Sequence, residues 1–195
     1  MNFGKKLGLT MMAGAICFSL VACAGDSGKQ NAEGSSASQS SSQTEEKLLE
    51  FSSPNNVYSI KIPDVKGGWT QTKGTNDYLL VLDNPDQSFS ILIQAYPKEN
   101  AVAKWGSVEK FADDYRKTNM SKFGEPTEDK VDIPIAENII AESYVVKQSG
   151  ISAKAVIAYF ETENYYYNYV ITGLEKEYDK NIDGQKKAMS SLTEN

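Results

Sequence analysis

The sequence predicts an α+β fold in which an antiparallel β-sheet of about six or seven strands is covered by helices on both faces. Three observations support this prediction. Beyond residue 47, apolar and polar residues alternate in several short segments, which is the period of a strand. Two other segments carry apolar residues at the spacing of one helical face. The later strands are apolar on both sides, and a sheet built from them must be covered on both faces.

Seven segments have the composition and the period of strands. In the second of them Tyr58, Ile60 and Ile62 share one side, and Pro63 ends it because proline lacks the amide hydrogen that a ladder needs. Turn-forming residues such as Ser149-Gly150 separate neighbouring segments. The predicted strands are residues 49–52, 57–63, 78–82, 88–96, 138–147, 151–160 and 164–172.

Two segments have the period of a helix. Val108, Phe111, Ala112 and Tyr115 recur at the spacing of one helical face within residues 107–123. Ser107 is a good N-cap, and Gly124 followed by Pro126 ends the pattern. A second helix is expected over residues 175–192, with Tyr178, Ile182, Met189 and Leu192 facing inward. These helices would cover opposite faces of the sheet.

The start of the chain has the features of a bacterial lipoprotein signal. Lys5 and Lys6 precede an apolar run that is shorter than the ~20 residues needed to span a bilayer. The run ends in Leu20-Val21-Ala22-Cys23, which resembles the lipobox of bacterial lipoproteins. This resemblance implies cleavage after Ala22, a diacylglyceryl group on the Cys23 thiol, and fatty acids such as palmitate in the anchor. The alternative is an ordinary secretory signal with an incidental cysteine.

The chain is therefore expected to consist of a signal peptide (1–22), a lipidated cysteine with a tether (23–46) and a globular domain (47–195). The tether is rich in Ser, Gly and Gln, which predicts disorder. Two acyl chains hold a protein stably on a bilayer. We expect a lipid-anchored protein on the extracytoplasmic face of the cell membrane, or on an outer membrane if the cell has two.

Composition excludes several classes of function. The chain has 26 acidic and 20 basic residues, and an acidic chain does not suit nucleic acid, which is bound by basic patches. The sequence contains no histidine, and Cys23 would be the only cysteine left after cleavage. This excludes Ser-His-Asp and Cys-His catalysis and zinc sites built on His or Cys. We expect no catalytic residue, no metal and no cofactor.

The order of the predicted elements resembles the PsbP-like family. The matching features are the motif F-x-S that begins at Phe51, the motif V-Y-S-I-K-I-P over residues 57–63, and Trp69 shortly after it. A long strand, a helix near Ser107, a run of antiparallel strands and a closing helix ending in Ser191-Leu192 follow. The resemblance covers most of residues 49–192.

This resemblance implies an α-β-α sandwich and a non-enzymatic binding or assembly role. The plant members are extrinsic subunits of photosystem II, and many bacterial members look like envelope lipoproteins. The resemblance implies no site residues here, because the metal-linked histidines of plant members have no counterpart in a chain without histidine.

A run of tyrosines forms the candidate binding surface. Tyr165, Tyr167 and Tyr169 share one side of the predicted strand, and tyrosines offer a large contact area with a polar tip. Together with Trp69 they could meet a sugar or a protein. The alternative is that the tyrosines pack in the core, that Trp69 closes one end of the sheet, and that Trp105 packs on the helix beginning at Ser107.

Acidic residues suggest three further sites, each with a structural alternative. A cluster of carboxylates could bind Ca²⁺, but its spacing fits no calcium loop, and a solvated surface is the alternative. Glu142 and Lys154 could form an acid–base pair or an ordinary ion pair between neighbouring strands. Glu142 and Glu161 could form a glycosidase-like pair at a suitable separation. The carboxylate cluster is Glu125, Glu128, Asp129 and Asp132, with Asp113 and Asp114 nearby in the sequence.

Three functions are consistent with the sequence. The leading hypothesis is a membrane-anchored binding or assembly module for an envelope protein. The second is a sensor or carrier of a small ligand such as a sugar, a metal or a cell-wall fragment. The third is a carboxylate-based hydrolase of wall polymers. Co-purification with a membrane complex, stabilisation by a ligand, or loss of turnover on replacing one carboxylate would distinguish them.

Overall fold

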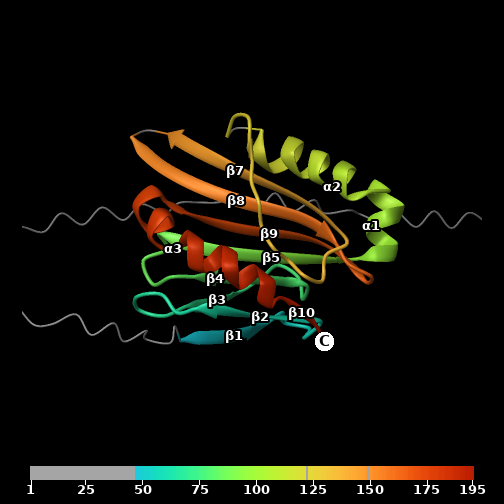
Figure 1. The fold of residues 1–195 in the computed structure, drawn as a ribbon, viewed down its shortest axis with the longest axis horizontal. Coiled ribbons are helices and arrows are strands. Elements are labelled where there is room, and N and C mark those ends of the chain that lie inside the picture. Colours follow the sequence, from blue (N-terminus) through green and yellow to red (C-terminus); the bar gives the residue numbers. More distant parts are fainter. Residues whose placement is uncertain (1–46, 122, 149) are drawn as a thin grey trace, which may run out of the picture. The chain divides into compact units, whose positions relative to one another are not determined.

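An antiparallel sheet of seven strands lies at the centre of the part of the chain that the structure describes (Figure 1). The computed structural model describes residues 47–121, 123–148 and 150–195, so the signal peptide, Cys23 and the tether lie outside it. The strand order is β3-β4-β5-β9-β8-β7-β6. The strands are β3 (Thr70–Lys73), β4 (Leu79–Asp83), β5 (Phe89–Pro97), β6 (Thr127–Glu128), β7 (Asn138–Gln148), β8 (Ile151–Glu161) and β9 (Tyr165–Leu174).

A smaller sheet in the described residues contains β1 (Leu48–Ser52), β2 (Tyr58–Pro63) and β10 (Thr193–Glu194), in the order β1-β2-β10. The sequence pattern predicted the first two of these strands but did not separate them from the main sheet. Tyr58, Ile60 and Ile62 are buried in a core cluster that also contains main-sheet residues, so packing, not strand pairing, joins the two sheets.

Helices cover both faces of the main sheet, as predicted. α1 (Lys98–Trp105) and α2 (Val108–Tyr115) lie on one face, and α2 continues as a π-helical segment, η1 (Arg116–Met120). α3 (Glu175–Ala188), followed by the 3₁₀ turn η2 (Met189–Ser191), covers the other face. Among the described residues, no helix is both long enough and apolar enough to cross a membrane. The α+β class and the two-sided cover are confirmed.

Some elements escaped prediction for identifiable reasons. β3 is exposed throughout and entirely polar, so it lacks the apolar alternation that marks a strand. β6 has two residues and is too short for a periodic signal. α1 has one buried residue, Ala101, and therefore a weak amphipathic pattern. The predicted helix over residues 107–123 changes to π-helix at Arg116, and Ser107 caps its start by accepting a hydrogen bond from the amide of Lys110 at 3.5 Å.

The core of the described part consists of two apolar clusters, one on each face of the main sheet. Alternation along β9 supplies both clusters, because Tyr167, Tyr169 and Ile171 enter the cluster beneath α3 while Tyr166 and Val170 enter the cluster beneath α2. Successive residues of β9 are thus buried on opposite faces of the sheet, and this explains why the later strands of the sequence are apolar on both sides.

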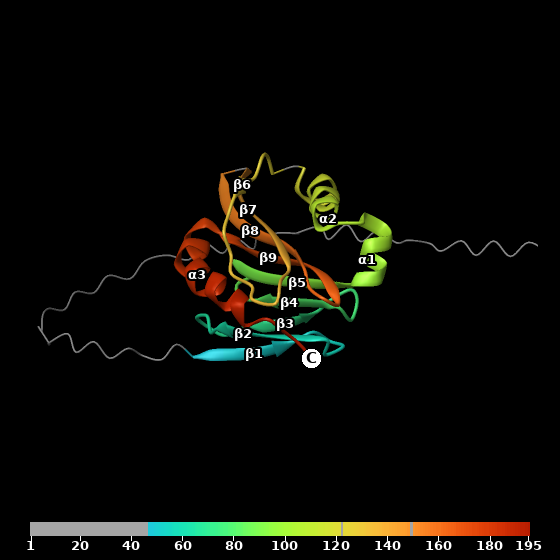
Figure 2. The ribbon, with the colours of Figure 1, turned by 45° about the vertical axis from the view of Figure 1, so that its right-hand side comes forward.

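Residues 124–137, here called the strap, connect the two faces around the outer edge of the main sheet (Figure 2). The strap begins after η1, passes through β6 at the edge, and then runs over the α3 side before the chain enters β7. Ile133 anchors it, with 2% of its surface exposed in the cluster beneath α3. The amide of Glu137 donates to the carbonyl of Glu161 at 2.8 Å as the strap ends.

Candidate functional site

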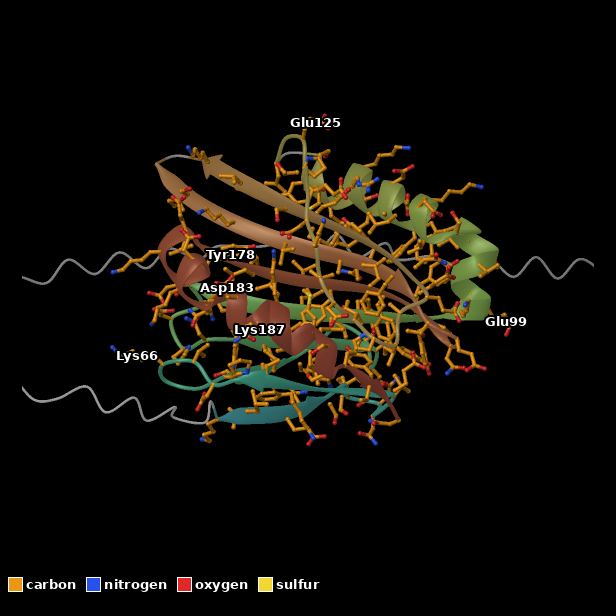
Figure 3. The ribbon with its side chains drawn as sticks, in the orientation of Figure 1. Lys66, Glu99, Glu125, Tyr178, Asp183 and Lys187 are labelled. Carbon is orange, nitrogen blue, oxygen red and sulfur yellow. The ribbon has the colours of Figure 1, made fainter. Side chains whose placement is uncertain are left out.

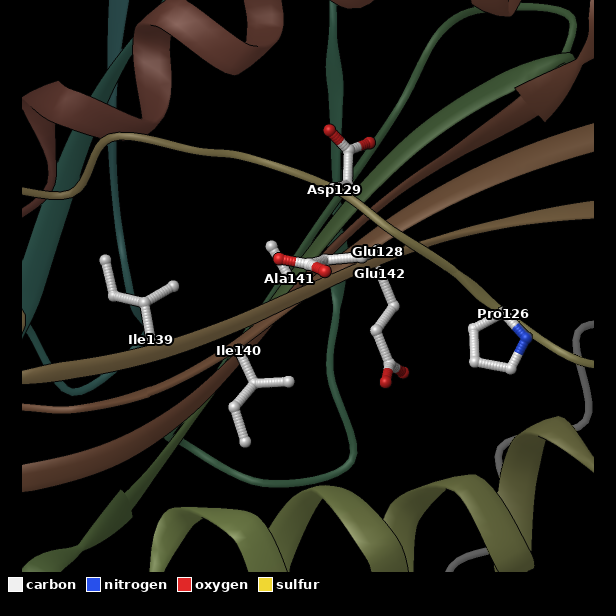
Figure 4. A pocket seen from close by; sticks show the side chains of 7 residues that line it. All are labelled: Pro126, Glu128, Asp129, Ile139, Ile140, Ala141 and Glu142. Carbon is white, nitrogen blue, oxygen red and sulfur yellow. The ribbon is translucent and has the colours of Figure 1, made fainter.

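The candidate site lies at the edge of the main sheet, between the strap and β7. A pocket of about 340 Å³ opens there. In the close view, Ile140 and Glu142 point toward α2, whereas Asp129 and Ile139 point the opposite way (Figure 4). The residues that line the pocket therefore come from both faces of the edge strand β7 and from the strap. Its lining consists of Pro126, Glu128, Asp129, Ile139, Ile140, Ala141 and Glu142.

An ion pair fixes the side of the site that faces α2. Arg116 begins η1, and its Nε lies 2.7 Å from Oε1 and 2.9 Å from Oε2 of Glu142, while its Nη2 also contacts Oε1. The carboxylate is buried and also accepts a hydrogen bond from the Tyr144 hydroxyl at 3.0 Å. The hydrogen bond with Glu142 raises the pKa of Arg116. This arrangement holds both charged groups in place and uses the donors and acceptors that a ligand would need.

Tyr159 closes the inner end of this polar group. Its ring lies beneath the Arg116 guanidinium at 5.9 Å, and its hydroxyl is buried without a hydrogen-bond partner among the described residues. Burial, followed by the nearby Tyr144 and Glu142, raises the pKa of Tyr159. A phenol in this environment stays neutral at any physiological pH and cannot act as a base there.

A second ion pair fixes the side of the site that faces α3. Lys186 Nζ lies 2.5 Å and 2.7 Å from the two carboxylate oxygens of Asp129, and the Ser143 hydroxyl also donates to this carboxylate. Burial works against ionisation, but the hydrogen bonds from Lys186 and Ser143 outweigh it and lower the pKa of Asp129. The strap is thereby attached both to α3 and to β7.

The outer edge of β7 is only partly covered. β6 pairs with it at Ser143 and Glu142, and the amide of Asp129 donates to the carbonyl of Ala141 at 2.9 Å. Beyond Ser143 the strap and β7 diverge, as seen toward Pro126 in Figure 4. Two of the four large apolar side chains that are exposed in the described part lie on this strand, Ile139 at 37% and Val145 at 53%.

The predicted tyrosine surface is not present at the surface of the domain. Tyr167 and Tyr169 are fully buried, so they cannot meet a partner there. Their face of β9 lies beneath α3 and the smaller sheet, because the strand contributes to both cores. The Tyr167 hydroxyl donates to Glu194 at 3.2 Å, and the ring stacks on Phe160 with centroids 4.9 Å apart.

The two remaining members of that predicted surface lie far apart. Tyr165 is half-buried and pairs with Pro97 at one end of β5, whereas Trp69 packs on Phe89 at the other end of β5. Trp69 Nε1 donates to the Pro63 carbonyl at 3.0 Å, which fits the predicted role of closing one end of the sheet. The structure therefore keeps the rings of Tyr165 and Tyr167 together, with centroids 5.8 Å apart, but places Trp69 at the opposite end of β5.

Trp105 also has the packing role that was predicted as the alternative. Its ring centroid lies 4.6 Å from that of Phe111 in α2, and its Nε1 donates to Asp114 at 2.9 Å.

The acidic residues do not converge on a cation site. Within the described part, no group of three or more carboxylates is arranged to hold a metal ion. Asp129 pairs with Lys186, Asp113 with Arg116, and Asp114 with Lys104 and Trp105. The predicted calcium cluster is therefore not assembled among the described residues, and Asp113, Asp114 and Asp129 are engaged by basic side chains or an indole.

The predicted pairing of Glu142 with Lys154 is wrong. In the register of β7 and β8, Glu142 lies opposite Ile157 and Lys154 lies opposite Val145. Glu142 instead pairs with Arg116. Lys154 reaches α3, where its Nζ lies 2.8 Å from Asp179 and 3.2 Å from Glu175.

The glycosidase-like pair is also wrong. Glu161 follows Ile157, the residue opposite Glu142, by four positions along β8. At about 3.3 Å per residue the two carboxylates start from backbone positions about 13 Å apart along the strand. Glycosidase pairs are separated by about 5–9.5 Å. Glu161 instead contacts Lys98 at 3.5 Å.

Sequence reasoning missed the edge of β7 as a site. The relevant signal was available in part, because Arg116 is the only arginine of the chain and follows directly on the amphipathic stretch of α2. That its partner is Glu142 depends on the tilt of α2 over the sheet, which no local pattern encodes. The exposure of Val145 depends in the same way on where the strap leaves the edge.

Comparison with known proteins gives likeness of fold only. No protein-family model matches the chain, and a search of curated proteins gives no match. The solved structures that it resembles include the Saccharomyces cerevisiae Ran-binding protein Mog1p, with 9% identity over 76% of this chain and 95% of that one, and a TM-score of 0.52.

Two further structures are similar at lower TM-scores. A crystal structure from Bacteroides thetaiotaomicron has 14% identity over 75% of this chain, with a TM-score of 0.48, and the chain spans 48% of that protein. Cyanobacterial PsbP (CyanoP) from Synechocystis sp. PCC 6803, a protein of the family that the sequence resembles, has 10% identity over 82% of this chain and 98% of that one, with a TM-score of 0.42. At 9% identity the likeness to Mog1p concerns the fold alone, and the function of the chain has to be argued from its own residues.

Proposed function

We propose that this chain is a lipid-anchored, non-enzymatic binding module that holds an envelope protein at the extracytoplasmic face of a membrane. The observation that carries the proposal is the motif Leu20-Val21-Ala22-Cys23 at the end of an apolar run preceded by Lys5 and Lys6. A lipid anchor followed by a flexible tether keeps a domain close to the bilayer while leaving it free to reorient.

The geometry of the domain supports binding over catalysis. The two most buried carboxylates at the candidate site are engaged in ion pairs, Glu142 with Arg116 and Asp129 with Lys186, whereas Glu128 is exposed. A general acid or base needs a free proton-transfer position next to the substrate, and a paired, hydrogen-bonded carboxylate offers none. The partly uncovered edge of β7, with exposed Val145, is instead a surface for contact.

The anchor is tested by metabolic labelling of cells with an alkyne analogue of palmitate. We expect the wild-type chain to be labelled and to partition with membranes, and the Cys23→Ala variant to lose both properties. Cys17→Ala is the matched control, because this cysteine lies within the signal peptide and should be dispensable. A labelled Cys23→Ala variant, or an unlabelled wild type, would contradict the anchor.

A small-ligand carrier is the second candidate, and the pocket between the strap and β7 is the observation that favours it. Thermal unfolding of residues 24–195 with Ca²⁺, Mn²⁺ or soluble wall fragments separates the two candidates. A ligand present at 100 times its dissociation constant adds about 2.7 kcal/mol to the free energy of unfolding. Such a saturable shift would favour the carrier, whereas an unchanged unfolding temperature is expected for a protein-binding module.

A further inference from the structure

We infer that residues 144–148 of β7 are the binding surface of this module, and that they accept an extended basic segment of the partner as an additional strand. The inference rests on the proposed binding role and names the surface that performs it. The candidate occupant follows from three properties of this edge, namely its free backbone, its exposed apolar side chain and the charges that flank it.

The backbone of this half-strand points its hydrogen-bonding groups outward at alternate residues. Asp129 bonds the carbonyl of Ala141 from outside the sheet, so the amide and carbonyl of Ala141 face the edge. The register of β7 with β8 is continuous from Asn138 to Gln148. Because orientation alternates along a strand, the same groups of Val145 and Lys147 also face outward.

No strand covers these groups among the described residues. β6 pairs with β7 only at Ser143 and Glu142 before the strap diverges from it. Five residues beyond this point, 144–148, belong to β7 and lie at the outer margin of the sheet in Figure 1. Uncovered edge amides and carbonyls are the template on which an extended peptide adds by main-chain hydrogen bonding.

The side chain of Val145 marks the centre of this surface. It is the second most exposed large apolar residue of the described part, at 53%. In an added strand, the residue directly opposite Val145 would lie on the same face and in contact with it. A β-branched or aromatic residue at that position of the partner would bury both side chains.

The flanking charges favour a basic partner. Lys154, opposite Val145, brings the half-exposed carboxylates of Glu175 and Asp179 to the same face. The exposed Glu125 and Glu128 lie on the strap at the other side of the edge, where Glu125 projects outward (Figure 3). Three lysines, Lys130, Lys147 and Lys154, offset part of this charge, so the four carboxylates and three lysines together keep a net charge of −1. Complementary charge guides encounter and suppresses acidic competitors.

The test uses hydrogen exchange of residues 24–195 by NMR with a synthetic peptide that has a Thr-Val-Thr-Val centre and two lysines at each end. We expect the peptide to slow exchange of the Val145 and Lys147 amides at least tenfold. The amide of Val146 is an internal control, because it faces β8 and is protected before the peptide is added. A peptide with glutamate in place of each lysine should give no protection.

Val145→Pro removes one outward amide and leaves the ladder with β8 intact, since proline is tolerated where the amide faces solvent. We expect it to weaken peptide binding about tenfold, as loss of one hydrogen bond and its geometry predicts. Val145→Thr keeps the amide and should bind within about threefold of wild type on the same scale. Circular dichroism checks that both variants fold. If Val145→Pro does not fold, the hydrogen exchange of the wild-type protein with the basic and acidic peptides still tests the inference.

Several outcomes would overturn the inference. These are equal protection by the acidic peptide, protection at other strands only, no protection at millimolar peptide, or unchanged affinity of a folded Val145→Pro. Protection of the same amides that rises with protein concentration in the absence of peptide would identify a second copy of the chain as the occupant instead.

A photo-cross-linkable residue in intact cells separates this surface from the binding role itself. We expect cross-links from position 145 and none from Val102, an exposed apolar residue of α1. Cross-links from position 102 alone would overturn the surface and leave the binding module. If neither position 145 nor position 102 gives cross-links although the peptide binds at β7, the result would count against an envelope partner.

Discussion

At the scale of single residues, this domain contains buried polar groups whose environments differ sharply. Glu142 accepts hydrogen bonds from Arg116 and Tyr144, whereas the nearby Tyr159 hydroxyl has no partner among the described residues. A buried polar group without a partner costs free energy, and a satisfied one costs little. Substitutions at these neighbouring positions should therefore have opposite effects.

Replacing Arg116 by Met should lower the free energy of unfolding by about 2–3 kcal/mol, because Glu142 would remain buried without its counter-charge. The value is below that of a fully buried pair, since 28% of the Arg116 side chain is exposed. Urea unfolding measures the change. The double variant Arg116→Met, Glu142→Met should recover most of the loss. Equal stability of the single variant and the wild type would show that the pair is not coupled to folding.

Tyr159→Phe should be neutral or stabilising by up to about 1 kcal/mol, because it deletes a buried hydroxyl that has no hydrogen-bond partner among the described residues. Tyr58→Phe is the matched control. Its hydroxyl donates to the Ile93 carbonyl at 2.6 Å and accepts from the Leu80 amide at 3.2 Å. The control should lose about 1–2 kcal/mol. Thermal unfolding measures the stability of both variants. A larger loss of stability in Tyr159→Phe than in Tyr58→Phe would show that the Tyr159 hydroxyl is the one that stabilises the fold.

Stability should fall in acid partly through Asp129. Its pKa is lowered in the folded protein from 3.8, despite its burial, by Lys186 and Ser143. A group with a depressed folded pKa contributes stability above its unfolded pKa and loses that contribution as the pH falls through the folded value. The loss therefore belongs below about pH 4. Unfolding free energies of wild type and Asp129→Asn should converge there and differ near neutrality. A constant difference between pH 3 and pH 7 would contradict this coupling.

At the scale of elements, the strap is the segment that the sequence describes least well. Val131, Ile133 and Ile135 alternate with Asp132 and Pro134 as in a strand, but the proline breaks the pattern, and of these three apolar residues only Ile133 is fully buried. By contrast, β7, β8, β9, α2 and α3 follow their patterns closely, because each contributes a repeated apolar set to one or both cores. The candidate site lies where the strap meets β7, and for this reason the sequence could predict the strands but not the site.

Ile133→Ala should loosen the strap and lower the free energy of unfolding by about 2–4 kcal/mol through the cavity it leaves. Hydrogen exchange should also become faster locally, at the amides of Ala136 and Asp129. The Ala136 amide donates to the Ile133 carbonyl within the strap, and the Asp129 amide donates to the Ala141 carbonyl of β7. Val131→Ala is a control, because that side chain is only half-buried and should cost less. Unchanged exchange at Asp129 would show that Lys186, not Ile133, holds the strap.

At the scale of the whole molecule, charge sets the conditions for association. The chain has a formal net charge of −6 at pH 7. A field of this sign accelerates the approach of a basic segment and is screened by salt, over a Debye length of about 8 Å at physiological ionic strength. Exposed residues dominate this field, whereas the ion pairs at Glu142 and Asp129 contribute little to it.

Raising the salt concentration from 0.02 M to 0.2 M should slow association of the basic peptide several-fold while leaving its dissociation rate nearly unchanged. Stopped-flow fluorescence with a labelled peptide measures both rates. The Glu125→Gln, Glu128→Gln variant should show a weaker salt dependence. Salt dependence confined to dissociation would mean that contacts in the complex, not the field around the domain, respond to ionic strength.

The smaller sheet has a mechanical consequence for a protein held at its amino-terminal side. β1 pairs only with β2 in the described residues, and Leu48 lies opposite Pro63 at the open end of that hairpin. A pull on residue 47 directed away from β2 would load the hydrogen bonds between β1 and β2 one after another, starting at this open end. Its five residues would release about 17 Å of slack at about 3.4 Å each, while β2 stays bonded to β10 and packed in the core. β1 would then detach before the force reaches the main sheet.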